Sequence, residues 1–586
     1  MNTIINKINK QAIWIAMCAF SFLFFTGCED FLDKQPLGRL SESVFTNKET
    51  IDKLVISCYS PLNGYMNGIT AWVAGPDNNY IAEMGAGNMH KGSTTGDQPL
   101  MLDMERFQIN ADNGRTNQKW ILCYGAIERC NDVLRTVRDN EISDLLESDK
   151  NQVIAEIRFL RAYYYFELRK IYLNVPYIDE NVTDPQRRVK NDHDIYPEIE
   201  ADFLHAIANL PETQSEPGRP TKSAAKSFLA KTYLYQQKFS QAKQLFDEVI
   251  ESGRYQLLPN YFDCFNAEKN NSSESIWANQ VAVNVAGASY NRSQRFSDLA
   301  YPNQDDFPQL TGAGFNQPSF DLVNAYKTGE DGLPLFGTYY LTDFKHDQGI
   351  ESNQEFEPDM TTPVDPRLDW VVGRRGVPYH DWSIHPGKRW IRDQPTAGPY
   401  NQKKWVILKS QVEKYGHDNQ AKFNAMCFPI IRYAQVLLFA AECEIEIGNP
   451  EKAREYINMI RARARDGYVV RLGADMPFGD GPPAANYKID IYKESWAGQT
   501  KEWMRDRVRF ETRLEMALEG HWHFDLVRWG IAESFINAYI GRESKIIQYL
   551  NGVSFGVNNS YFPIPLAQID RSYLDGQPTL TQNPGY

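Results

Sequence analysis

Residues 221–250 read TKSAAKSFLAKTYLYQQKFSQAKQLFDEVI, and this stretch predicts the fold of much of the chain. Its apolar and small side chains recur at spacings of three and four, the pattern of a helix that buries one face. Thr221 is a suitable N-cap for a first helix, which runs to Tyr235. The chain turns near Phe239 and Ser240 and continues as a second helix to Ile250. The stretch therefore predicts an antiparallel helical hairpin.

The spacing inside this hairpin resembles that of a tetratricopeptide repeat. Leu229, Ala230 and Tyr233, followed by Ala242 and Phe246, match the L-G-x2-Y…A-x3-F pattern of that repeat. The leading Trp and the closing Pro of the consensus are absent. Small residues are needed where the two paired helices approach closely, so the two alanines mark the expected contact.

A second hairpin of the same kind is predicted far downstream. Ala441 and Ala453 are separated by the same interval as Ala230 and Ala242. Between them, Gly448-Asn449-Pro450 supplies a C-cap and then a proline at the start of the next helix. Helical hairpins are thus expected on both sides of a different kind of region.

That region is the segment 277–428, which is rich in Gly, Pro, Asn, Asp and aromatic residues and has little periodicity. Such a composition predicts loops, short helices and small hairpins. Loops of this length are usually functional, and the many aromatic residues argue against the alternative of disorder. The predicted fold class is mainly α: tetratricopeptide-like helical hairpins form a superhelical scaffold, and a large irregular region binds a ligand.

The start of the chain predicts export. Lys7 and Lys10 precede the apolar run 12–25, which is too short for a membrane-spanning helix of about 20 residues but has the length of a signal-peptide core. Phe25-Thr26-Gly27-Cys28 resembles the bacterial lipobox, in which the cysteine receives a lipid, although Phe25 stands where an aliphatic residue is usual. The alternative is an ordinary signal peptide with a chance cysteine. We expect residues 1–27 to be removed and Cys28 to anchor the protein to a membrane.

Charge and cysteine content narrow the possible functions. The net charge of −13 disfavours nucleic acid and anionic lipid as partners, because both need a basic surface. The remaining cysteines show no CxxC or CxxH pair that would indicate a metal site, and we expect them to be buried free thiols. They are Cys58, Cys123, Cys130, Cys264, Cys427 and Cys443.

Six segments, in order along the chain, together resemble the SusD/RagB family of surface glycan-binding lipoproteins. They are CEDFLDKQP from Cys28, AEIRFLRAYYYFELRKIYLNVPY from Ala155, SAAKSFLAKTYLY from Ser223, IRYAQVLLFAAECEIEIGNPEKAREYINMIRARA from Ile431, RFETRLEMALEGHWHFDLVRWG from Arg509 and YFPIPLAQIDRSYLDGQPTLTQNPGY from Tyr561. Small departures, such as Trp522 in place of a common Arg, leave this resemblance intact.

The resemblance implies a non-enzymatic protein that captures oligosaccharides on the outer face of the outer membrane. Its implied partner is a SusC-like TonB-dependent transporter, on which it would sit as a lid. Glu29 and Asp30, directly after Cys28, resemble a signal that sends lipoproteins to the outer surface. We expect an N-terminal helical-repeat region at 28–270 and a C-terminal region at 271–586, the latter including loop-rich 277–428 and helical 430–530. No cofactor is expected, and a structural calcium ion is left open.

A site for sugars needs flat aromatic surfaces with hydrogen-bonding side chains at their edges. One candidate segment carries four tryptophans among polar residues, in which turn-forming Gly and Pro should place side chains on the surface. Its members are Trp370, Tyr379, His380, Asp381, Trp382, Trp390, Arg392, Asp393, Gln394 and Trp405. A second candidate is Trp72 with Asp77, Asn78, Asn79 and Tyr80. For each tryptophan a core role remains the alternative, and Trp120 and Trp277 are assigned to the core.

A lipid-anchored glycoside hydrolase is the alternative function. Such an enzyme needs two carboxylates across a cleft, and no acidic motif singles out a pair. His521 and His523 point to different faces of a helix, which makes them a poor metal pair. Glu519, Asp525 and Arg528 are expected to join helices through buried ion pairs. No catalytic or metal-binding residue is therefore predicted.

Overall fold

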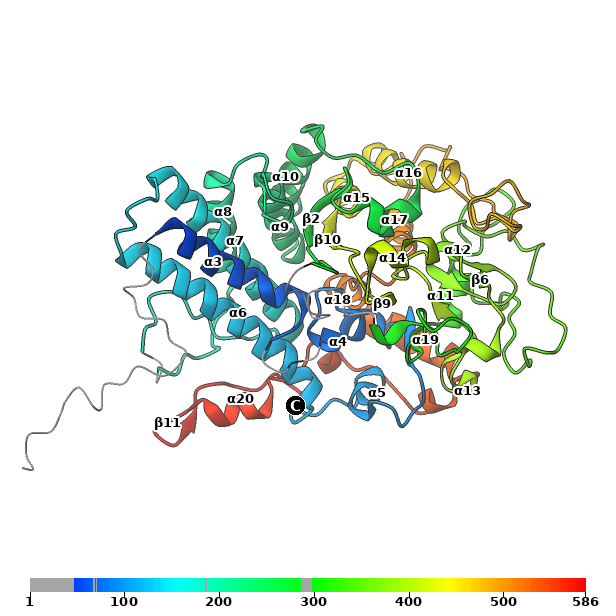
Figure 1. Cartoon of the computed structure of the whole chain (residues 1–586), viewed down its shortest axis with the longest axis horizontal. Coiled ribbons are helices and arrows are strands. Elements are labelled where there is room, and N and C mark those ends of the chain that lie inside the picture. Colours follow the sequence, from blue (N-terminus) through cyan, green and yellow to red (C-terminus); the bar gives the residue numbers. More distant parts are fainter. Residues whose placement is uncertain (1–46, 67–68, 70, 185–186, 286–297) are drawn as a thin grey trace, which may run out of the picture.

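The computed structural model describes residues 47–66, 69, 71–184, 187–285 and 298–586, and these residues are mainly helical (Figure 1). The predicted fold class is confirmed. Cys28 and the predicted signal peptide lie outside the described residues. The longer helices are α3 (Lys48–Tyr59), α6 (Gly114–Asp139), α7 (Glu147–Tyr172), α8 (Tyr196–Asn209), α9 (Lys222–Tyr235), α10 (Phe239–Glu251), α15 (Tyr433–Ile447), α16 (Pro450–Asp466), α17 (Lys501–Met516) and α19 (Ala532–Glu543).

Consecutive helices pack side by side and form one stack. Helices α6, α7, α8, α9 and α10 each contact the next, and α3 lies against α6. The stack then continues across a gap in the sequence, because α10 packs against α15, which contacts α16 and α17. In Figure 1 the first four long helices form the left part of the molecule and α9 and α10 the middle. The predicted hairpins thus belong to one scaffold, and the loop-rich segment leaves it after α10 and returns at α15.

The hairpin α9–α10 begins and packs as its sequence predicts. The Thr221 side chain accepts a hydrogen bond from the Ala224 backbone N–H at 3.2 Å and caps α9. Ala230 and Ala242 are both fully buried, so the expected close contact of the two helices is confirmed. In the second hairpin Gly448 adopts a left-handed backbone with φ 97° and ends α15, and Pro450 starts α16.

The loop-rich half consists of short elements, as expected. The strands pair as two-stranded antiparallel sheets: β1 (Met89–Gly92) with β3 (Phe315–Pro318), β2 (Ser275–Asn279) with β10 (Phe428–Arg432), β4 (Val372–Gly373) with β7 (Asn401–Gln402), β5 (Pro378–Tyr379) with β6 (Ser383–Ile384), β8 (Gly416–His417) with β9 (Gln420–Asn424), and β11 (Tyr573–Leu574) with β12 (Gln577–Pro578). Short helices are α4 (Ala71–Ala74), α5 (Pro99–Glu105), α11 (Phe320–Ala325), α12 (Leu368–Val371), α13 (Gln394–Ala397), α14 (Val412–Tyr415), α18 (Trp522–Arg528) and α20 (Leu566–Arg571).

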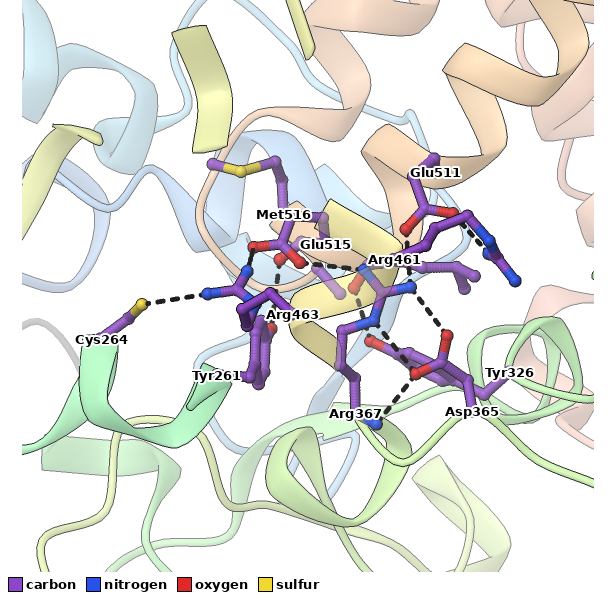
Figure 2. Close-up of polar contacts among 12 residues, drawn as sticks. Tyr261, Cys264, Tyr326, Asp365, Arg367, Arg461, Arg463, Glu511, Glu515 and Met516 are labelled. Carbon is purple, nitrogen blue, oxygen red and sulfur yellow. Dashed lines mark hydrogen bonds and ion pairs between the residues drawn. The ribbon is translucent and has the colours of Figure 1, made fainter. Parts of the chain in front are cut away.

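A buried cluster of charges joins the loop-rich half to the helical stack (Figure 2). At its centre the Glu515 carboxylate, on α17, accepts hydrogen bonds from Arg432 at 2.7 Å, from Arg367 at 2.9 Å and from Arg463. The cluster holds five cations and five carboxylates, so its formal charge is balanced. They are Arg367, Lys404, Arg432, Arg461 and Arg463, and Glu274, Asp365, Glu511, Glu515 and Glu519.

The structure assigns several further side chains to packing. Trp120 and Trp277 are 4 % and 2 % exposed, which confirms their place in the core. The six cysteines are free thiols and all but Cys264 are buried, as expected. Among the described residues, no helix combines the length and the apolar character that crossing a bilayer would require.

Candidate functional site

Trp382 and Trp390 are buried, so the expectation that turns would expose them is wrong. They are 3 % and 0 % exposed. The Trp382 indole N–H donates to the Ile407 carbonyl at 3.0 Å, and that of Trp390 donates to the Asp306 carboxylate at 2.8 Å. Because an indole buries a large apolar area once its single N–H has a partner, the folded loops use these rings as their own core.

The polar neighbours of these rings are also part of the loop core. Tyr379 is fully buried and donates its hydroxyl hydrogen to the Gln402 carbonyl. His380 is buried against the rings of Trp370 and Phe262, and burial lowers its pKa well below the usual value. The Asp381 carboxylate accepts hydrogen bonds from the backbone N–H groups of residues 409 and 410, so it holds a turn. None of these three residues is positioned to contact a ligand.

Residues 77–80 are buried as well. Asn79 is fully buried in a turn of π-helix, and neither amide atom of its side chain has a hydrogen-bond partner in the described part of the protein. Burial raises the pKa of Asp77 to about 8, so this carboxyl is protonated near neutral pH. The segment is covered by residue 520, where a side chain would collide with the Asp77 carbonyl, so that a glycine is required. Asn79 therefore does not reach the surface, contrary to the role predicted for it.

Trp72 is the predicted aromatic residue that stays partly accessible. It lies on α4 and is half-buried against the core. The Arg115 guanidinium lies over its ring, with the central carbon 5.5 Å from the ring centroid. Arg115 begins α6, where the Asn113 side chain accepts its backbone N–H at 2.9 Å. Its guanidinium also donates to the Gln98 side chain, just before α5.

Arg392 joins the second predicted segment to this place. Its Nη1 donates to the Asp97 carboxylate and to the Ser93 hydroxyl, both at 2.7 Å. Asp97 is the neighbour of Gln98, so contacts run continuously from Trp72 through Arg115 and the turn 93–98 to Arg392. The two segments that the sequence singles out therefore meet, but through Trp72 and Arg392 only. We call the residues Trp72, Asp97, Gln98, Arg115 and Arg392 the Trp72–Arg392 surface.

Asp393, next to Arg392, has a more local contact. It is partly buried and accepts the Thr396 hydroxyl hydrogen at 2.7 Å, where α13 begins. It lies beside the Trp72–Arg392 surface in sequence, and its printed contact serves the turn rather than that surface.

A buried lysine holds the turn 93–98 from below. The Lys91 ammonium donates to the carbonyls of Thr94 at 2.7 Å and Asp97 at 2.6 Å, and it lies 5.0 Å from the Phe315 ring centroid. Burial lowers the pKa of Lys91 to about 8, against the opposing effect of Glu105 and Asp97. The turn that carries Asp97 and Gln98 is thus fixed by a side chain from β1 before any ligand arrives.

The Trp72–Arg392 surface has the chemistry that a hydroxyl-rich ligand requires. A partly accessible indole offers an apolar face, while guanidinium, amide and carboxylate groups offer hydrogen-bond donors and acceptors at its edge. The sequence analysis did not single out Asp97, Gln98 or Arg115. The turn-forming run STTGDQP at 93–99 is the signal that points to the first two.

The carboxylates near the C-terminal helices serve packing, as predicted. Arg528 binds Asp525 at 2.8 Å and Glu442 at 2.6 Å, which ties α18 to α15. Glu519 binds Arg432 at 2.8 Å and Lys404 at 2.6 Å. In the described part of the chain, no group of three His, Cys, Asp or Glu side chains is arranged to hold a metal ion.

Two family models match this chain. The model described as "SusD family" matches residues 273–586, and the model described as "Starch-binding associating with outer membrane" matches residues 30–234. Among named relatives, the SusD-like protein P25 of Formosa agariphila is 25% identical over 87% of this chain and 89% of its own. A SusD-like protein of Bacteroides ovatus is 28% identical over 56% of this chain and 58% of its own.

Solved structures agree in fold. A SusD-like protein from Bacteroides fragilis has a TM-score of 0.68 at 21% identity, over 94% of this chain and 100% of that one. Surface glycan-binding protein A from Bacteroides thetaiotaomicron, in complex with laminarihexaose, has a TM-score of 0.64 at 21% identity, over 92% and 100% of the two chains. At these identities the likeness shows the fold.

Proposed function

Because this chain belongs to the SusD family, we propose that it is a surface lipoprotein that captures an oligosaccharide and delivers it to an outer-membrane transporter. SusD-family proteins are non-catalytic, so the protein is not an enzyme and the glycoside hydrolase alternative is set aside. The observation that carries the site assignment is the contact of Arg392 with Asp97 beside the partly accessible Trp72.

The proposed ligand is an oligosaccharide bound at the Trp72–Arg392 surface. One face of a sugar ring would pack on the accessible part of Trp72, and ring hydroxyls would bind Arg115, Gln98 and Arg392. The turn 93–98 is already held by Lys91, so binding requires little ordering of this turn. The solved relative in complex with laminarihexaose supports an oligosaccharide as the class of ligand.

We propose that the protein is anchored through a lipid on Cys28 and faces the cell exterior. The lipobox-like residues 25–28 and the acidic residues after them support this placement, as does the description of the matched N-terminal model as outer-membrane associated. The proposed partner is a SusC-like TonB-dependent transporter, which the protein would close as a lid. The helical stack would face this transporter.

Binding measurements on two variants and one matched control test the sugar site. Trp72→Ala removes the aromatic face, and Arg392→Ala removes a donor that bridges the two segments. Aromatic contacts of this kind contribute about 0.5 to 1.5 kcal/mol beyond area burial, so Trp72→Ala should weaken binding by about tenfold once lost burial is included. Arg392→Ala should weaken it by several-fold.

The matched control is Arg389→Ala, which removes a guanidinium that is 57% exposed and pairs with Asp306, three residues before Arg392. It should leave affinity unchanged. Titration calorimetry with oligosaccharides chosen by a glycan-array screen measures each variant, beside a thermal melt. Wild-type affinity in both Trp72→Ala and Arg392→Ala would place the site elsewhere.

Localisation and partner have separate tests. Cys28→Ala should leave the precursor without its lipid, so that the protein no longer fractionates with the outer membrane in cells that lack the transporter. Retention of that variant after a high-salt wash would contradict the anchor. Copurification of the wild-type protein with a TonB-dependent transporter, and release of no reducing ends from polysaccharides, are the results expected of a lid.

A further inference from the structure

A second groove lies outside the Trp72–Arg392 surface and shares no residue with it. The loop 330–336, the segment 488–499 and the first two turns of α17 enclose about 770 Å³. That volume lies in the range of small-ligand sites, roughly 300 to 1,000 Å³. The groove is lined by aromatic and polar side chains in similar number, so it is not an apolar docking face.

The centre of the groove is a stacked arginine. The Arg507 guanidinium carbon lies 3.7 Å from the ring centroid of Trp503 and 4.3 Å from that of Phe336, so the two rings hold it in place. One nitrogen donates to the Trp503 carbonyl at 3.1 Å. Within the described residues, no carboxylate lies at ion-pair distance from Arg507, whereas its helix neighbours Arg505 and Arg509 both pair with Glu502.

The acidic residues around the groove do not replace that missing partner, because most are already engaged. Lys488 binds Glu330, and Asp490 binds both Lys493 and Arg465. The Asp331 carboxylate accepts a backbone N–H at 3.0 Å, from residue 333. A half-buried guanidinium with free donors therefore faces a wall whose charges are largely neutralised by one another.

Two aromatic side chains of the groove also carry polar atoms that the protein leaves unpaired. The Tyr492 hydroxyl and the Trp496 indole N–H have no hydrogen-bond partner in the described part of the molecule, and these residues are 5 % and 1 % exposed. Buried polar groups are rarely left this way, and such groups call for an external oxygen. Together with Arg507, the groove presents donors that lack acceptors.

We propose that this groove is a second carbohydrate-binding site, specific for a sugar residue that carries an oxyanion. Its carboxylate or sulfate group binds the free donors of Arg507, and its ring packs against the accessible parts of Trp503 and Phe336. A planar guanidinium matches both oxyanions with paired hydrogen bonds, and stacking pre-organises it. The site would let the protein hold an acidic polysaccharide at two points.

Calorimetry on the full mature protein tests the proposal with three probes of equal length. They are a hexuronate trisaccharide, a sulfated hexose trisaccharide and an uncharged hexose trisaccharide. We expect at least one charged probe to bind the wild type, and Arg507→Gln and Trp503→Ala to weaken that binding by about tenfold or more. The charged probe that binds identifies the oxyanion. The uncharged probe should respond to neither substitution.

Two controls separate this site from the first and from misfolding. Trp72→Ala should bind the charged probe as the wild type does, so failure of one site leaves the other testable. Arg509→Gln removes a neighbouring guanidinium outside the groove and should have no effect. Arg507→Lys keeps the charge without the planar fork and should lose less affinity than Arg507→Gln. Absence of binding by both charged probes, or equal affinity in wild type and the two Arg507 variants, overturns the proposal.

Discussion

Replacing Glu515 by Gln tests whether the buried charge cluster holds the loop-rich half to the helical stack. The substitution keeps the shape of the side chain and removes one negative charge where Arg367, Arg432 and Arg463 converge. The five cations of the cluster would then face four carboxylates, in a place where Glu515 and Arg367 are fully buried. Removing one partner of a buried ion pair destabilises a protein by about 3 to 5 kcal/mol, because an uncompensated charge stays buried.

That loss of stability converts to a modest change in melting temperature. The entropy of unfolding is about 2.1 cal/mol/K per residue, so a cooperative unit of roughly 500 residues has about 1 kcal/mol/K. Glu515→Gln should therefore lower the midpoint by about 3 to 5 °C in scanning calorimetry. If the loop-rich half unfolds separately, its own transition should fall further. The matched control, Glu502→Gln, removes a carboxylate that is 63% exposed on the same helix and should shift the midpoint far less.

The effect should also depend on pH in one direction. Burial alone would raise the pKa of Glu515, but the guanidinium groups of Arg463, Arg432 and Arg367 hold it well below the usual range. A carboxyl with a depressed folded pKa contributes stability that is present above its unfolded pKa of about 4.3 and is lost as the pH falls below it. The difference between wild type and Glu515→Gln should shrink below that pH. Equal melting of wild type, Glu515→Gln and Glu502→Gln at pH 7 would refute the reasoning.

Three further substitutions test the packing. Burial against the rings of Phe166, Phe228 and Phe439 lowers the pKa of Lys231 to about 7, so the unfolded chain binds this proton more tightly; wild-type stability should rise from pH 7 toward 10, and Lys231→Met should lose that slope in thermal melts. Burial opposes charge on His90, but Glu105 and Glu543, each 2.9 Å away, raise its pKa to about 9; the stability lost in His90→Gln at pH 6 should therefore vanish above pH 9, and a pH-independent loss would contradict the ion pairs. Ala242→Leu should overpack the contact of α9 with α10 and cost about 1 to 3 kcal/mol in denaturant unfolding, whereas an unchanged midpoint would argue against that contact.

The sequence by itself determined the helical scaffold, because its signals are local. Helical periodicity, the Thr221 cap and the Gly448-Asn449-Pro450 break each act within one or two turns, and the structure confirms all three. The paired alanines predicted the helix contacts for the same reason. The roles of Glu519, Asp525 and Arg528 in buried ion pairs also followed from their setting in an apolar helical segment.

Only the tertiary structure decided which aromatic side chains meet solvent. Gly and Pro mark turns, but a turn is exposed only if nothing packs over it, and that depends on residues far away in the chain. Trp382 finds its carbonyl partner 25 residues later, and Trp390 reaches a carboxylate 84 residues earlier. The Trp72–Arg392 surface depends on the contact of Arg392 with Asp97, which are 295 residues apart. No local pattern encodes such distances, because they arise from the return of the loop-rich segment onto the N-terminal turn.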